Sequence, residues 1–302
     1  MTRRNGAAAP APMAWAFGRM AVLLICALLL APWNAPVRAQ TAQPRTVSFP
    51  SADGKTTLVG YLFAPDGRPR TAPAVILLHG RNGAYSARAH GNYSSVTLEK
   101  KLRSWAELWS AQGYWALIVD SYGPRGYPQG FATGGDLARV PAVSEVDVRP
   151  LDAYGALRYL KSSPRIRPDR IALQGWANGG SAALASVAPD SLAWAGADLD
   201  RGFRMAVALY PDCVLEDKYK GGYKPFAPVH ILVGARDEEE AACNALAGSS
   251  KAEGGNTALT VFAGATHDFD DPERSRAQTP ANAAASAEAR RLVTGYLASV
   301  LR

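Results

Sequence analysis

The chain alternates short, continuously apolar runs with stretches that place apolar residues at helical spacing. The apolar runs read AVILLHG, YWALIVDSYG, RIALQGWA, MAVALYPDC, VHILVGARD and LTVFAGATHDF, the first beginning at Ala74 and the last at Leu259. Runs of this length, rich in β-branched residues, are typical of strands that are buried on both faces of a parallel sheet. The alternation therefore predicts an α/β fold with helices on both faces of a mostly parallel sheet.

Other segments complete this architecture. Ahead of the first run, TVSF and TTLVGYLFAP flank a turn at Asp53–Gly54 and predict an antiparallel hairpin. Helices are predicted at 98–113, 149–164, 179–188 and 281–302, and Trp105 and Trp109 in the first of them are expected to pack in the core. No internal repeat or long low-complexity linker interrupts the pattern, so residues 40–302 are predicted to form a single domain.

The first 39 residues predict a cleaved secretory signal peptide. Arg3, Arg4 and Arg19 precede the apolar stretch AVLLICALLLAPW, and VRAQ follows with small residues at the positions that a signal peptidase requires, which places cleavage after Ala39. The apolar stretch is shorter than the roughly 20 residues that a transmembrane helix needs. We therefore expect a periplasmic or secreted protein with no membrane attachment after cleavage.

Loss of the leader changes both the charge and the cysteine content. The leader holds four arginines and no acidic residue, so the formal net charge of +7 falls to +3 in the mature protein and gives no reason to expect nucleic-acid binding. Cys26 leaves with the leader, and Cys213 and Cys243 remain. In an oxidising compartment two cysteines predict one disulfide, with two buried free thiols as the alternative.

Residues that can carry chemistry follow the predicted strands. In a parallel sheet, ligands bind at the carboxyl ends of the strands. One of these ends reads Gly175-Trp176-Ala177-Asn178-Gly179, which matches the nucleophile elbow G-x-S-x-G except that alanine stands where the serine is expected. Asp237 and His267 follow two later runs, and the order elbow, acid, histidine is the order found in α/β-hydrolases.

Each of these positions has a predicted role. A serine at position 177 would attack a carbonyl carbon, His267 would take its proton, and Asp237 would orient the imidazole. The backbone N–H groups of Asn178 and Arg81 are the predicted oxyanion hole. Asp237 has the alternative of capping the helix that begins at EEEAAC, with Glu238 and Glu239 competing for the acid role.

The motifs as a set resemble the dienelactone hydrolase family, in particular its exported branch. They are LLHGRNG, WAELWSAQGYWALIVDSYGPRG, DAYGALRYLKSSPRIRPDRIALQGWANGG, ALYPDC, APVHILVGARDE and FAGATHDFD, and they extend from about Ala72 to Asp271. The resemblance implies an α/β-hydrolase fold and hydrolysis of a small-molecule ester or lactone through a Ser or Cys nucleophile, His267 and Asp237, without metal or cofactor. Ala177 departs from the family pattern, so we expect this chain to bind substrate and barely turn it over.

The remaining predictions concern substrate contacts. Tyr122, Arg125 and Trp176 are predicted to line the substrate site, with Arg125 binding a substrate carboxylate; its alternative is a surface pair with an acid such as Asp136 or Asp147. The Gly-rich segment 127–145 is either a flap over the cleft or a solvated connection.

Two functions are compatible with these residues. The first is a carboxylic ester or lactone hydrolase whose serine was replaced, deliberately or recently, by Ala177. The second is a natural, non-catalytic periplasmic protein that binds a small acid or ester in the same pocket. The presence of both Asp237 and His267 favours the first.

Overall fold

The computed structural model describes residues 43–131, 140–191, 196, 202–215, 218–219, 221–273 and 278–302. The predicted signal peptide, residues 1–39, lies outside this part of the chain. Residues Ala42–Arg302 form one compact unit. None of the helices in the described residues has the length and apolar content that a membrane span requires.

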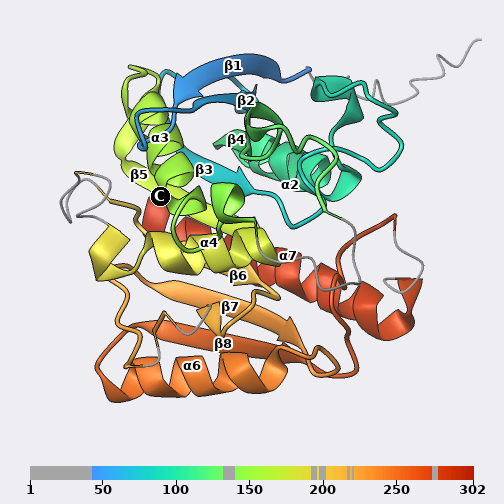
Figure 1. Ribbon diagram of the computed structural model, residues 1–302, viewed down its shortest axis with the longest axis vertical. Helices are drawn as coiled ribbons and strands as arrows, with labels where there is room; N and C mark the ends of the chain where they lie inside the picture. The colour runs from blue at the N-terminus through green and yellow to red at the C-terminus, as the bar shows by residue number, and fades with distance from the viewer. Residues whose placement is uncertain are drawn as a thin grey trace, which may run out of the picture. The chain divides into compact units, whose positions relative to one another are not determined.

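An eight-stranded sheet runs through the described residues in the order β1-β2-β4-β3-β5-β6-β7-β8 (Figure 1). The strands are β1 (Arg45–Pro50), β2 (Thr57–Phe63), β3 (Ala72–Leu78), β4 (Trp115–Asp120), β5 (Ile166–Trp176), β6 (Ala206–Leu209), β7 (Val229–Gly234) and β8 (Thr257–Phe262). β1 and β2 form the predicted antiparallel hairpin, and β2 joins β4 in antiparallel fashion. The other pairings are parallel, so the predicted mostly parallel sheet is confirmed.

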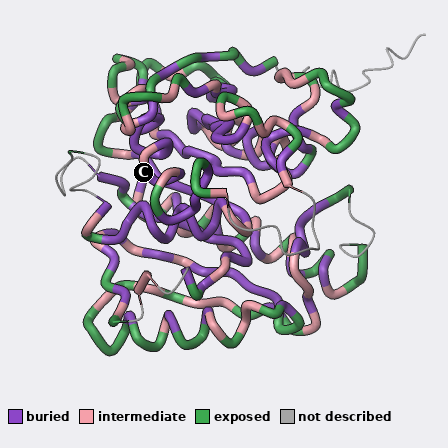
Figure 2. Tube along the Cα trace, viewed as in Figure 1, coloured by how far each residue is buried: buried purple, intermediate pink, exposed green. Residues whose placement is uncertain are grey.

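Helices cover both faces of the sheet. They are α2 (Lys100–Ala111), α3 (Arg149–Lys161), α4 (Asn178–Ser186), α6 (Glu240–Ala252) and α7 (Pro280–Leu301), with short 3₁₀ turns η1 (Ser95–Thr97), η2 (Gly123–Arg125) and η3 (Pro141–Val143). Apolar residues of α3, α4 and α6 pack in one core cluster, and those of α2 and α7 pack in another. In Figure 2 the central strands are buried along their length, and α6 is buried on one side and exposed on the other.

The alternation of side chains along each strand explains why two cores form. In β3, Ala74, Ile76 and Leu78 belong to the first cluster, whereas Val75 and Leu77 belong to the second. A strand that is apolar at every position can therefore serve both faces, as its continuous apolar run predicted. Trp105 and Trp109 are fully buried in the second cluster, which confirms their predicted core role.

β5 is longer than its apolar run. The apolar run RIALQGWA predicts a strand from Arg170. Pro168 and Asp169, which precede this run, are uncommon in a regular strand interior. The structure begins β5 at Ile166 and accommodates the extra residues by a register shift against β3, with Ala72 opposite Ile166 and Ala74 opposite Ile171.

Candidate active site

The turn between β5 and α4 has the geometry of a nucleophile elbow. Ala177 lies between the two elements with φ 46° and ψ −119°, a backbone conformation that residues with a side chain rarely adopt. A Cβ on Gly175 would lie 2.0 Å from the Gly179 carbonyl oxygen, and a Cβ on Gly179 would lie 2.2 Å from the Leu78 carbonyl oxygen. Both positions therefore require glycine, and the tight turn holds residue 177 at the end of the central strand.

Asp237 and His267 come together from the segments that follow β7 and β8. The Nδ1 atom of His267 lies 3.0 Å from Oδ2 and 3.2 Å from Oδ1 of Asp237. Because a carboxylate only accepts hydrogen bonds, Nδ1 carries the proton and Nε2 is free to act as a base. The Asp237 side chain is fully buried, whereas that of His267 is 29% exposed.

Asp237 contacts the imidazole and does not cap α6, whose N-cap residue is Glu239. Its Oδ1 atom also accepts the backbone N–H of Glu239, 3.1 Å away, in the turn that leads into α6. Glu239 has a different partner, the backbone N–H of Cys213 at 3.4 Å. The carboxylate in contact with the imidazole is therefore that of Asp237.

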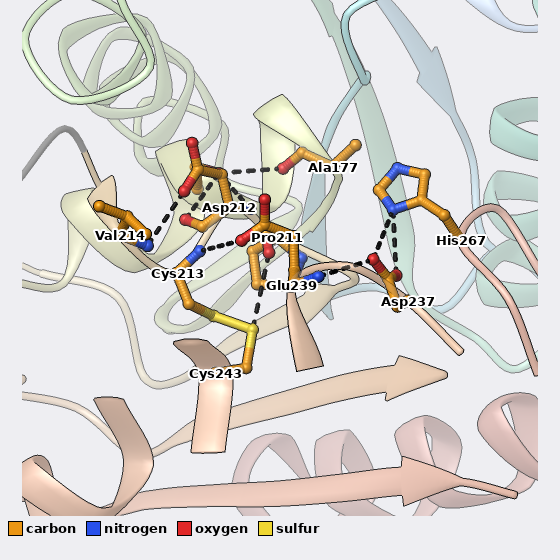
Figure 3. Close-up of a disulfide and its surroundings, with 10 residues drawn as sticks. Ala177, Pro211, Asp212, Cys213, Val214, Asp237, Glu239, Cys243 and His267 are labelled. Carbon is orange, nitrogen blue, oxygen red and sulfur yellow. Dashed lines mark hydrogen bonds and ion pairs between the residues drawn. A yellow bond between two sulfur atoms is a disulfide. The ribbon is translucent and has the colours of Figure 1, made fainter. Parts of the chain in front are cut away.

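The elbow and the His–Asp pair meet at one edge of the sheet. The backbone N–H of Ala177 donates to the carbonyl oxygen of Leu209, 3.0 Å away, and the next residue, Tyr210, packs its ring against His267 with the centroids 4.8 Å apart. Figure 3 shows the imidazole of His267 beside Ala177, with Nδ1 turned to Asp237. The structure thus brings together the three predicted positions, although residue 177 offers only a methyl group.

Asn178 and the loop that carries Arg81 both lie close to Ala177. Asn178 is the first residue of α4, where a backbone N–H has no acceptor within the helix. The loop after β3 passes close by, since a Cβ built on Gly80 would lie 3.7 Å from the Ala177 Cβ. Arg81 follows in this loop, and its carbonyl oxygen accepts the backbone N–H of Phe131 at 2.9 Å.

A buried polar network connects Asn178 to the loop that follows β3. The Asn178 Oδ1 atom accepts hydrogen bonds from the Tyr122 hydroxyl, at 2.9 Å, and from Nη1 of Arg149. Nη2 of Arg149 donates to the His79 carbonyl oxygen at 2.7 Å. Arg149 was not among the predicted site residues; the one available signal was its place in the first turn of a predicted helix, where a cation is unfavourable.

His79 belongs to the same network as a neutral imidazole. Burial holds its pKa well below the usual value, and the nearby Arg149 charge lowers the pKa further. Nε2 of His79 accepts the backbone N–H of Ser121 at 3.2 Å, so Nδ1 carries the proton and donates to the Gly80 carbonyl oxygen at 2.8 Å. The ring therefore fixes the start of the loop that follows β3.

The structure contradicts three predictions of substrate contact, those for Trp176, Tyr122 and Arg125. Trp176 is fully buried and donates from Nε1 to Oδ2 of Asp270 at 3.0 Å, because the residue before the elbow points into the core. Tyr122 is also buried, and its hydroxyl is held by Asn178. Both side chains support the site from inside the protein and do not line it.

The predicted substrate contact of Arg125 is the third one that the structure contradicts. Its Nη1 and Nη2 atoms each lie 2.8 Å from one oxygen of Asp152, and Nη2 lies 3.2 Å from Oδ2 of Asp53. A guanidinium held in this way by carboxylates is not available to a substrate carboxylate. Of the alternative partners, Asp136 lies outside the described residues, and Asp147 pairs with Lys218 at 3.6 Å.

The segment predicted as a flap or a connection is described only at its two ends, 127–131 and 140–145. Its first part packs on the loop that follows β3, because a Cβ on Gly130 would lie 2.2 Å from the carbonyl carbon of Asn82.

The segment that carries His267 is anchored by a second buried network, which was also not predicted. The Asp270 carboxylate accepts hydrogen bonds from Nε1 of Trp105 and Trp176, at 2.8 and 3.0 Å, and from the Tyr210 hydroxyl at 2.6 Å. The Lys101 ammonium lies 3.6 Å from a carboxylate oxygen of Glu99 and of Asp268, and 3.9 Å from one of Asp271. These contacts connect α2 and β5 to the segment that carries His267.

The predicted disulfide between Cys213 and Cys243 is present (Figure 3). It joins the segment after β6 to α6, and its two cysteines are 30 positions apart in the sequence. Because α6 follows directly on Asp237 and Glu239, the bridge also restrains the segment that carries the acid.

Several solved structures of other proteins share this fold. The chain is similar to the dienelactone hydrolase-like promiscuous phosphotriesterase P91 from metagenomic libraries, with 18% identity, 85% and 98% of the two chains covered and a TM-score of 0.65. It is also similar to the Thermogutta terrifontis esterase Est2 with propionate bound, with 18% identity, 86% and 96% coverage and a TM-score of 0.58. A Klebsiella pneumoniae protein described as a dienelactone hydrolase has 16% identity, 84% and 99% coverage and a TM-score of 0.59.

These likenesses show an α/β-hydrolase fold, as the sequence predicted. No curated protein matches the chain. The model of the dienelactone hydrolase family matches residues 58–301, which include the elbow, Asp237 and His267. The chain therefore belongs to the dienelactone hydrolase family.

Proposed function

We propose that this site is that of a carboxylic ester or lactone hydrolase whose nucleophile has been replaced by Ala177. One observation carries the proposal: Ala177 keeps the strained conformation of a nucleophile elbow beside an intact His267–Asp237 pair. An alanine gains nothing from φ 46°, since the conformation serves to present a side chain above the sheet. The chain with Ala177 is thus expected to bind its substrate and release almost no product.

With serine at position 177, the arrangement supports acyl transfer. Nε2 of His267 would take the hydroxyl proton as the oxygen attacks the substrate carbonyl carbon. The negative oxygen of the tetrahedral intermediate would be held by the backbone N–H groups of Asn178 and Arg81. His267 would then return the proton to the leaving alkoxide, and water would release the acid from the acyl-enzyme by the same steps.

The alanine removes the attacking atom and leaves the other groups in place. Loss of a triad nucleophile costs on the order of 10⁶ in kcat and leaves roughly 10³-fold catalysis over water from the oxyanion hole and substrate binding. Residual hydrolysis by the chain with Ala177 would use a water molecule that His267 activates in the space of the missing hydroxyl.

The test is the Ala177→Ser substitution, assayed on short-chain p-nitrophenyl esters and on lactones. We expect hydrolysis to increase by at least about 10³-fold over the unaltered chain. The matched control, Ala177→Ser with His267→Ala, should return to the level of the unaltered chain. If Ala177→Ser is folded and inert on all of these substrates, the hydrolase proposal is wrong, and a non-catalytic binding protein is the better description.

We also propose that the protein is exported to the periplasm or secreted. The basic, apolar and small residues of segment 1–39 support export, and so does the Cys213–Cys243 disulfide, since the cytosol keeps thiols reduced. Expression of the full chain in a Gram-negative host should give a periplasmic protein whose N-terminus is Gln40. Recovery of the uncleaved chain in the cytosol would contradict the proposal.

A further inference from the structure

Arg149, the first residue of α3, is buried and contacts both segments that carry the predicted oxyanion-hole N–H groups, the start of α4 and the loop after β3. The residue is 0% exposed. Nη1 donates to the side chain of Asn178, Nη2 donates to the His79 carbonyl oxygen at 2.7 Å, and the guanidinium lies 5.1 Å from the centre of the Tyr122 ring. The Asn178 and His79 acceptors are both neutral, one an amide oxygen and the other a backbone carbonyl oxygen.

In the part of the chain that the structure describes, the guanidinium of Arg149 has hydrogen-bond partners but no ion-pair partner. Across the described residues no carboxylate forms an ion pair with it, and its Nε atom is buried without a hydrogen-bond partner. The Arg149 charge opposes the rise that burial causes in the pKa of Asp120, but that carboxylate is held by the Tyr85 hydroxyl at 2.9 Å and by backbone N–H groups.

This placement is not what the stability of the fold requires. A buried charge without an opposite charge in contact is unfavourable, and a cation in the first turn of a helix is also opposed by the helix dipole. Stability therefore does not explain why an arginine occupies position 149.

Arg125 provides the contrast within the same structure. Its side chain is 8% exposed, and its guanidinium makes a two-pronged contact with the buried carboxylate of Asp152. Such a pair stabilises a fold once it is buried, because removing either partner leaves the other charge uncompensated. Arg125 has the partners of a structural arginine, and Arg149 does not.

The location of Arg149 indicates what it does. Asn178 carries one predicted oxyanion N–H, and His79 begins the loop that carries the other, on Arg81. The planar guanidinium holds acceptors from both elements at a fixed spacing, which a lysine could not do. In addition, the N-terminus of α4 and the guanidinium place positive charge on the side of the site where the carbonyl oxygen becomes negative.

We propose that Arg149 is a positioning residue for the oxyanion hole. It sets the distance between the Asn178 and Arg81 N–H groups, and its unpaired charge favours the negative oxygen of the tetrahedral intermediate. The inference rests on the proposed hydrolase function. Because the oxygen is negative only after attack, the effect belongs to kcat more than to KM.

The experiment uses the mature chain with Ala177→Ser and compares it with the same chain carrying Arg149→Met, Arg149→Lys or Arg125→Met. For Arg149→Met we expect kcat on p-nitrophenyl butyrate to fall about 100-fold with KM changed by less than about 3-fold. Arg149→Lys should lie between, since it keeps the charge and loses the bridge. The melting temperature should fall clearly for Arg125→Met and by much less for Arg149→Met.

Each outcome decides the matter. If Arg149→Met keeps kcat within about 3-fold of the Ala177→Ser chain, the inference is overturned while the hydrolase function stands. If Arg149→Met melts as low as Arg125→Met and Arg149→Lys is equally unstable, Arg149 is a structural residue and the inference is also wrong. If Ala177→Ser itself is folded and inert, the proposed function fails and this inference fails with it.

Discussion

Ala177 holds a backbone conformation that its own side chain disfavours, with φ 46° and ψ −119°. Strained positions of this kind cost about 1 to 3 kcal/mol and persist only where the surroundings impose them. Here the N–H of Ala177 is bound by Leu209, and its carbonyl oxygen accepts the backbone N–H of Ser181 at 2.9 Å. The strain belongs to the elbow and is present with alanine at position 177.

Ala177→Gly should therefore stabilise the protein. Glycine adopts positive φ without a steric penalty, and the relief of strain exceeds the added entropy of the unfolded chain, so the free energy of unfolding should rise by about 1 kcal/mol. Urea unfolding monitored by tryptophan fluorescence measures the change. A stability equal to or below that of the unaltered chain would show that the turn is not strained.

Gly179→Ala should have the opposite effect. Its new Cβ would lie 2.2 Å from the Leu78 carbonyl oxygen, so β3 and α4 would have to move apart. We expect a loss of about 3 kcal/mol in the free energy of unfolding. Gly248→Ala is the matched control: this residue is exposed in α6, a Cβ there would have open space within 4 Å, and the change should add about 0.5 to 1 kcal/mol. Equal effects at both positions would contradict the steric explanation.

Among the secondary-structure elements, α2 and the segment after β8 are joined by a cluster of buried charges. Lys101 faces Glu99, Asp268 and Asp271, so acids outnumber the base. Burial raises the pKa of the Glu99 carboxyl to about 7; the Lys101 ammonium opposes this rise, and the carboxylates of Asp271 and Asp268 add to it. The contact between α2 and the segment that carries His267 is therefore sensitive to pH.

This shift gives a pH dependence with a definite sign. The folded chain keeps a proton on Glu99 that the unfolded chain releases near its ordinary pKa of 4.5, so stability falls as pH rises from about 4.5 to 7. Over this pH range the free energy of unfolding should fall by about 3 kcal/mol in total. Glu99→Gln mimics the protonated form and should equal the unaltered chain at pH 4 but exceed it in stability at pH 8. Parallel curves of stability against pH for the two proteins would contradict this assignment.

For the molecule as a whole, the disulfide is the one covalent link between distant segments in the described residues. It joins the segment after β6 to α6, across a sequence separation of 30. Both segments border the site: Cys213 donates its N–H to Glu239, and Asp212 donates its N–H to Ser181 Oγ at 3.0 Å in α4. The bridge therefore restrains the side of the molecule on which the acid and the elbow lie.

Removing the bridge should lower stability without changing the fold. For a loop of this length the chain-entropy relation predicts a loss of about 3 to 4 kcal/mol. The double variant Cys213→Ala with Cys243→Ala tests this by urea unfolding, and a reducing agent should destabilise the unaltered chain but leave the variant unaffected. If the variant and the unaltered chain unfold at the same urea concentration, the bridge does not contribute to stability.

The sequence by itself determined the architecture and the three central positions. Continuous apolar runs identified the buried strands, because a strand covered on both faces is apolar at successive positions, as Val75 and Ile76 are. The elbow glycines and the order of residues 177, 237 and 267 placed the candidate site at the strand ends. These signals are local or depend only on the order of elements along the chain.

Only the tertiary structure decided what the surrounding side chains contact. Arg125 meets Asp152, which is 27 positions away, and Trp176 meets Asp270, which is 94 positions away, so neither faces a substrate. Arg149 was overlooked because its partners, Asn178 and His79, come from two different strand ends. The direction of a buried polar side chain depends on which distant group completes its hydrogen bonds, and that group is set by packing rather than by the residues beside it in the sequence.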